Sequence, residues 1–269
     1  MALKTVASSA NQKPRPWKIW WLVAIVILLL CILVQIPAIW LLGKFAPDSK
    51  LIQQVSGNLW HGSAIVQLPP ELSANPSSVV TGSVMWQWRP WALFLGKVGM
   101  DVEIESGQTR LQGQINRSFS QWQLQDWSGK IDKQTLSSVV NWQLPDAPIQ
   151  INALSLSYDK SVGFEDVDGQ LTWVGGEMGY PSGNKIYQIL LPAMRADISN
   201  ENKDNKQVIH ANLVDNNNKR LGDLYIDNDA MLDVSLTQRF LENMPEYSGS
   251  APADTAVVSV RQPLLGGQS

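Results

Sequence analysis

The stretch IQINALSLSY, residues 149–158, alternates apolar and polar side chains from one residue to the next. A period of two places the apolar side chains on one face of a strand and the polar ones on the other. Residues 114–115, 122–125 and 230–236 show the same alternation. Gly, Asn, Asp or Pro separates such segments about every ten residues, as an antiparallel meander requires. The sequence therefore predicts a mainly β domain with one solvated face.

Glycines precede many of these alternating segments. They are Gly57, Gly82, Gly113, Gly129, Gly169 and Gly222. Glycine fits bulges and bends, so their recurrence predicts a curved, mostly antiparallel sheet. Residues 91–95, 133–140 and 237–244 are the candidates for a few short helices. Residues 256–261 are expected to form an edge strand between flexible ends.

The composition of the 269-residue chain excludes several classes of protein. Hydrophobic residues make up 44% and charged residues 17%, so the chain is expected to fold. The single cysteine, Cys31, cannot form an internal disulfide or a thiolate metal cluster. Five of the 21 basic residues precede residue 46, which leaves 16 against all 24 acidic residues in the remainder. That acidic remainder argues against nucleic-acid binding.

Residues 19–43 are 25 consecutive residues without a charge. A helix of that length exceeds the roughly 30 Å hydrocarbon core of a bilayer. A cleaved secretory signal has a shorter apolar stretch, so the run predicts an uncleaved single-pass transmembrane anchor. Lys13, Arg15 and Lys18 before the run place the N-terminus in the cytoplasm and export the rest.

Aromatic side chains at both ends of the run match the belts found at membrane interfaces. Pro37 lies late in the run, where it either kinks the helix toward a partner or is simply tolerated. The expected anchor residues are Trp17, Lys18, Trp20, Trp21, Pro37 and Trp40. We divide the chain into a cytoplasmic tail (1–18), the anchor (19–43), an exported β domain (46–247) and a C-terminal edge strand with a flexible tail (248–269).

No catalytic motif is present in the sequence. His61 and His210 are the only histidines, and both are expected to point to solvent. Acidic clusters at 165–168 and 223–233 can in principle hold calcium, but turns and solvated strand faces explain them better. We therefore predict no catalytic residue, no metal and no cofactor.

Tryptophan is the remaining unusual feature, with 12 residues in the chain. Trp86 and Trp88, in the segment MWQWRPW (85–91), are two residues apart and so share one face of a strand. Two interpretations stay open. The indoles either bind sugars, peptides or acyl chains, or fill the core of a curved sheet.

Three segments carry a resemblance to a known family. VSGNLWHGSA (55–64), VMWQWRPWAL (84–93) and DGQLTW (168–173), placed after a basic tail and one apolar span, resemble protein N of the bacterial type II secretion system. The residues that carry the resemblance, as structural or partner-binding positions, are Gly57, Leu59, Trp60, Gly62, Trp86, Trp88, Arg89, Pro90, Leu93, Gly169, Leu171 and Trp173.

The resemblance implies a non-enzymatic accessory subunit in the inner membrane, with its C-terminal domain in the periplasm. Its implied partners are other type II secretion components and inner-membrane lipids, in unknown copy number. The layout is also similar to bridge-like lipid-handling proteins, in which an anchored, curved sheet holds acyl chains in a groove. Lipid or acyl-chain binding is therefore the alternative function, and an unrecognised periplasmic hydrolase is a third.

Overall fold

The computed structural model describes residues 17–39, 52–67, 81–139, 143–182, 185–203, 206–244 and 247–263. Within them, thirteen strands form one sheet and two more form a separate hairpin. The elements in chain order are α1 (Trp17–Gln35), β1 (Ile52–Gly57), β2 (His61–Gln67), β3 (Thr81–Arg89), η2 (Pro90–Leu95), β4 (Val98–Ser106), β5 (Thr109–Arg117), β6 (Gln121–Ile131), α3 (Lys133–Val139), β7 (Ile149–Asp159), β8 (Gly163–Trp173), β9 (Gly176–Ser182), β10 (Lys185–Leu191), β11 (Met194–Lys203), β12 (Lys206–Asp215), β13 (Arg220–Ile226), β14 (Met231–Thr237), α4 (Gln238–Leu241) and β15 (Ala256–Pro263).

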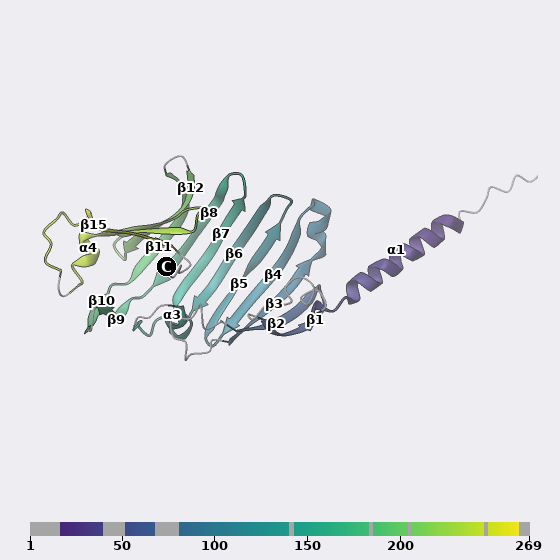
Figure 1. Cartoon of the computed structure of the whole chain (residues 1–269), viewed down its shortest axis with the longest axis horizontal. Helices are drawn as coiled ribbons and strands as arrows, with labels where there is room; N and C mark the ends of the chain where they lie inside the picture. The colour runs from purple at the N-terminus through teal and green to yellow at the C-terminus, as the bar shows by residue number, and fades with distance from the viewer. Residues whose placement is uncertain are drawn as a thin grey trace, which may run out of the picture.

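The large sheet is a meander in which each strand pairs antiparallel with the next, in the order β1 to β8 and then β11 to β15. The hairpin β9–β10 interrupts this sequence and pairs only with itself. Figure 1 shows the strand direction turning along the sheet, so that β15 lies across the direction of β4. The predicted mainly β, antiparallel architecture is confirmed, and the alternating segment at 149–158 forms most of β7.

The buried core lies toward the C-terminal part of the sheet. Its central cluster consists of Leu144, Met178, Ile189 and Leu191, with Leu136, Trp173, Met194, Phe240 and Met244 packed against it. These residues come from β8 to β11, from the helices α3 and α4, and from the segments that adjoin them. We call them the capping cluster, because they cover one end of β8 and β11.

Each predicted helical segment forms a short helix. Residues 91–95 lie in the 3₁₀ helix η2, and residues 238–241 form α4 after the buried Thr237. Asp132 caps α3, since its carboxylate accepts the Thr135 backbone N–H at 2.8 Å. Burial raises the pKa of Asp132, but hydrogen bonds from Thr135 and Gln108 outweigh burial and hold the pKa below its ordinary value.

The helix α1 extends away from the β1 end of the sheet (Figure 1). Its side chains from Trp20 to Leu28 are exposed. Among the described residues, no helix combines the length and the apolar character that crossing a bilayer requires. Trp17 and Lys18 begin α1, whereas Trp40 and the rest of the predicted span to residue 43 lie outside the described residues, as do the tail segments 1–16 and 264–269.

Candidate functional site

One face of the sheet carries an unbroken row of apolar residues. Directly paired residues of antiparallel strands project to the same face, so strand register identifies such a row. The central row runs Val55, Ala64, Val84, Ile104, Leu111, Gly129, Ile151, Leu171, Ala196, Leu213, Gly222, Leu236 and Val258. All thirteen strands contribute one residue, and each residue is apolar or glycine. We call this side of the sheet the apolar face.

A second apolar row runs beside the first. Its members are Gly57, Gly62, Trp86, Val102, Gly113, Trp127, Leu154, Gly169, Ile198, Ala211, Leu224, Val234 and Val260. A third, shorter row consists of Trp88, Met100, Ile115, Leu124 and Leu156. The alternation seen in the sequence therefore adds up to a continuous apolar surface two to three rows wide.

Most of this surface is only half-buried. In the central row, Ala64, Ala196 and Gly222 are buried and the other ten residues have intermediate exposure. Among the described residues, the capping cluster covers the face beside Leu171 and Ala196, through Trp173 and Met194. Apolar side chains along the rest of the rows remain partly accessible, and a contiguous accessible apolar surface commonly marks an interaction site.

The segment SGNLWHG (56–62) consists of the turn between β1 and β2 and the strand ends beside it, and we call it the hairpin junction. Asn58 Oδ1 accepts the backbone N–H groups of Trp60 at 3.0 Å and His61 at 2.8 Å. The Leu59 backbone N–H donates to the Ile36 carbonyl at 3.2 Å. The Pro37 backbone forms an isolated bridge with Asn58. This hairpin junction therefore fixes the chain just after α1 to the first edge of the sheet.

Two tryptophans of the second segment pack on the hairpin junction. The Trp86 indole N–H donates to the Leu59 carbonyl at 3.3 Å. The Trp88 backbone N–H donates to the Trp60 carbonyl at 2.8 Å, and the two indoles meet edge to face with centroids 6.1 Å apart. The first two of the three segments that carry the family resemblance thus meet at one place, whereas the third lies in β8.

Glycine is required where an indole crosses a neighbouring strand. A Cβ atom at Gly62 would lie 2.2 Å from the Trp86 ring, and one at Gly113 would lie 2.5 Å from the Trp127 ring. Both distances are shorter than any ordinary van der Waals contact, so a side chain at either glycine would displace the indole.

The residues singled out from the sequence fall into two groups. Seven lie on the apolar face: Gly57, Gly62, Trp86, Trp88, Gly169, Leu171 and Trp173. Leu59 and Trp60 lie in the hairpin junction, Pro90 and Leu93 in η2, and Arg89 on the opposite face. The prediction that Trp86 and Trp88 share one face agrees with the strand register.

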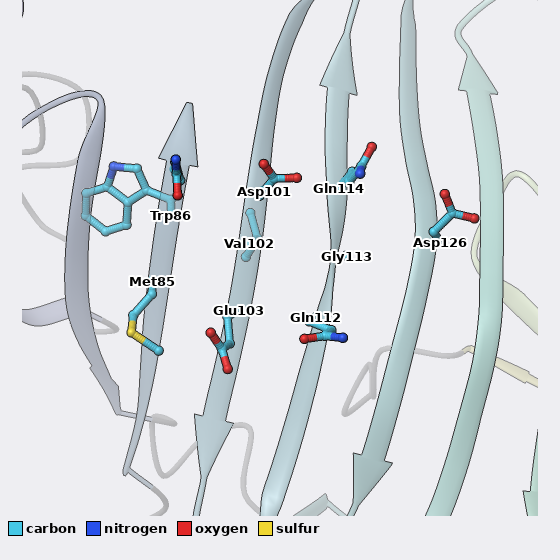
Figure 2. A pocket seen from close by; sticks show the side chains of 10 residues that line it. Met85, Trp86, Asp101, Val102, Glu103, Gln112, Gly113, Gln114 and Asp126 are labelled. Carbon is cyan, nitrogen blue, oxygen red and sulfur yellow. The ribbon is translucent and has the colours of Figure 1, made fainter. Parts of the chain in front are cut away.

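Arg89 belongs to a polar patch on the other face. Its guanidinium donates to Asp101 at 3.0 Å and to Gln114 at 2.8 Å. Beside this pair lies a shallow hollow of about 340 Å³. Figure 2 shows its carboxylates and amides standing on three neighbouring strands: Asp101, Glu103, Gln112, Gln114 and Asp126. The polar patch thus lies behind the hairpin junction, on the solvated side of β3 to β6.

His210 and Asp223 differ from the prediction that they face solvent. Asp223 is buried, and His210 lies between two carboxylates, with Nε2 2.9 Å from Asp223 and Nδ1 3.0 Å from Glu201. The imidazole stacks on the Tyr225 ring at a centroid distance of 4.6 Å. Burial, followed by the charges of Asp223 and Glu201, raises the pKa of Tyr225.

Sequence reasoning missed this network because its three strands bring together residues 201, 210, 223 and 225 only through register. His61, in contrast, is exposed as predicted. Within the described part of the chain, no group of three or more His, Cys, Asp or Glu side chains is arranged to hold a metal ion.

The fold and its surfaces define a class of protein: a long antiparallel β meander with one open apolar face, tied at its first hairpin to an apolar helix. The sequence pattern of the type II secretion system (T2SS), protein N family matches residues 51–222. The chain belongs to this family, and the match extends from just before β1 into β13. No curated protein and no solved structure matches the chain.

Proposed function

We propose that this chain is a non-enzymatic accessory component of the type II secretion system. The family match carries the proposal, because residues 51–222 contain all three of the segments quoted above and most of the apolar face. The chemistry supports a binding role: the described side chains form packed indoles, ion pairs and apolar rows. Family membership supports a role as a component of type II secretion. That this role is an accessory one is our inference.

We propose further that residues 19–43 anchor the chain in the inner membrane, with residues 1–18 in the cytoplasm and the sheet in the periplasm. The support is the length of the uncharged run and the basic residues before it. Trp17, Lys18, Trp20 and Trp21 would then lie at the cytoplasmic interface and Trp40 at the periplasmic one. Pro37 would lie where the chain leaves the bilayer and meets the hairpin junction.

We assign contact with other secretion components to the end of β3, where Trp88 lies on the apolar face and Arg89 on the opposite face. Arg89 keeps 42% of its side chain exposed while bonded to Asp101, so a partner can reach it. Trp91, which follows directly in η2, is 78% exposed. Arginine and tryptophan are among the residue types that are enriched in protein interfaces.

The test is a secretion assay in a host whose export of a type II substrate depends on the full-length chain. Arg89→Ala and Trp88→Ala are expected to reduce the secreted fraction while the chain stays at its normal level. Gln87→Ala, on the same strand and face as Arg89, serves as the matched control for Arg89→Ala. Unchanged secretion in the Trp88 and Arg89 variants, with partner capture intact, would remove this surface as the binding site.

Cross-linking with mass spectrometry on native membranes tests the wider proposal. Links from the sheet to other secretion components are expected, at the protein's normal level of expression. If the sheet gives no such links and deletion of the chain leaves secretion unchanged, the chain is not a working component of the system.

A further inference from the structure

We propose that the apolar face binds the acyl chains of bilayer phospholipids along its rows. This inference goes beyond the secretion role and does not depend on it. Thirteen strands spaced by about 4.8 Å give a strip roughly 58 Å long. Its two full rows lie about 7 Å apart, and the third row widens the strip to roughly 14 Å between β3 and β7. The resulting footprint, on the order of 500 Å², lies in the upper part of the range for the largest apolar patch of a typical monomer, about 300–600 Å², and patches of this size are often functional.

The strip begins at the apolar helix. Its second row starts with Gly57 and Gly62, which belong to the hairpin junction. In the same junction, the Leu59 backbone N–H donates to the Ile36 carbonyl just after α1. Between α1 and this junction, Ala38 is buried, whereas the large apolar side chains of α1 are exposed. The apolar strip and the chain that follows α1 therefore meet at the hairpin junction.

The two long sides of the strip differ in a way that suits an amphipathic lipid. The capping cluster stands along one side at β8 and β11. The other side ends in a rim of Val98, Arg117, Trp122, Tyr158 and Phe164, which pair across β4 to β8. Arg117 is exposed and stacks over the Trp122 ring at 4.4 Å, and Tyr158 packs on Phe164 at 5.3 Å.

Such a rim combines a cation with amphipathic rings. A guanidinium at the edge of an apolar surface complements a lipid phosphate, and indole and phenol rings favour the boundary between hydrocarbon and headgroups. The rim therefore provides a place for the headgroup while the acyl chains lie on the rows. Charge and apolar surface are arranged as a phospholipid requires.

Backbone hydrogen bonding favours a lipid over an extended peptide as the ligand of this face. Within the rows, the sheet's own N–H and C=O groups are engaged in the strand ladders, so a peptide lying across them would bury its own groups without partners. An acyl chain has no such groups. A hydrocarbon ligand is therefore favoured on this face, whereas a peptide would be expected at the open edges of β1 and β15.

The test uses the full-length chain in vesicles of phosphatidylethanolamine and phosphatidylglycerol that contain a phospholipid with a diazirine on one acyl chain. After irradiation, mass spectrometry maps the labelled residues. Label is expected on central-row residues from β2 to β8, in addition to α1. Label confined to α1 and the hairpin junction, or equal label on both faces of the sheet, would overturn the proposal.

A charged residue placed in the central apolar row provides the decisive variant for acyl-chain binding along that row. Leu111→Asp is expected to abolish labelling beyond β5 while β2 to β4 remain labelled, and Leu111→Asn keeps the test available should the aspartate variant not fold. Gln112→Asp, the next residue on the polar face, should leave the labelling pattern unchanged. Labelling that passes Leu111→Asp unaltered, or recovery of a bound polypeptide in place of lipid, would contradict the inference.

The secretion assay keeps the two proposals apart. Normal dependence of secretion on the chain without any label on the sheet would refute the lipid inference alone. Label along the central row in a host that secretes equally well without the chain would refute the secretion role alone.

Discussion

At the scale of single residues, the pairing of Gly62 with Trp86 links the sequence motif to the shape of the apolar face. The indole lies across β2 because position 62 has no side chain, and its N–H reaches the Leu59 carbonyl only from that position. A glycine on one strand thus makes room for the indole of a tryptophan on the next strand. Gly113 and Trp127 show the same arrangement.

Gly62→Ala is expected to destabilise the protein by about 1–3 kcal/mol, because the added methyl group overlaps the Trp86 ring. The double variant Gly62→Ala, Trp86→Leu should lose less than the sum of its single changes, since a smaller side chain at 86 relieves the overlap. Denaturant unfolding of the purified full-length chain measures both. Strictly additive losses would show that the glycine is not needed for the indole.

Residue chemistry was predictable from sequence where it depended on one strand only. The alternation of Trp86 and Trp88 places them on the same face, and the structure agrees. The surroundings of His210 were not predictable, because Glu201 and Asp223 reach it from two neighbouring strands. A histidine between two polar positions of one strand carries no signal of the carboxylates beside it.

At the scale of elements, the hairpin β9–β10 shows how an insertion supplies the core that the open sheet lacks. Ile189 is 3% exposed and belongs to the capping cluster, whereas Leu190, its neighbour on the same strand, is 70% exposed. The strand β10 thus places one apolar side chain in the core and the next in solvent.

Ile189→Ala is expected to cost about 2–5 kcal/mol, through lost burial and the cavity left behind. Leu190→Ala should change stability by no more than about 0.5 kcal/mol, since its side chain is already largely in solvent. Thermal or denaturant unfolding of the two variants, compared with the unmodified chain, gives the difference. Equal losses at both positions would mean that the hairpin does not pack as described.

The hairpin itself was not predicted. KIYQILL (185–191) lacks the strict alternation that marks 149–158, because Leu190 is apolar on the exposed side. The regular strands and the three short helices were recognisable, since period-two patterning and turn residues are local properties. The open apolar face depends on the register of thirteen strands, and that register cannot be predicted from any single segment of the sequence.

At the scale of the whole molecule, each strand of the meander contacts mainly its two neighbours, so stability is distributed along the sheet as in a repeat protein. Buried apolar side chains are unevenly spread. Among the described residues, only Ala38, Ala64 and Val102 of this buried set precede Leu144, and the others lie beyond it. The end of the sheet next to α1 therefore has the smallest share of the core.

This asymmetry predicts that the sheet opens in stages. Amides of β2 to β4 are expected to exchange with deuterium faster than those of β8 and β11 to β13, because local opening of the first strands exposes little buried surface. Hydrogen exchange of the full-length chain followed by mass spectrometry tests this, with exposed α1 omitted from the comparison. A single rate across all strands would instead require one global opening. Graded protection would mean that the strands nearest the hairpin junction, which bear Trp86 and Trp88, are also those that can rearrange when a ligand or partner arrives.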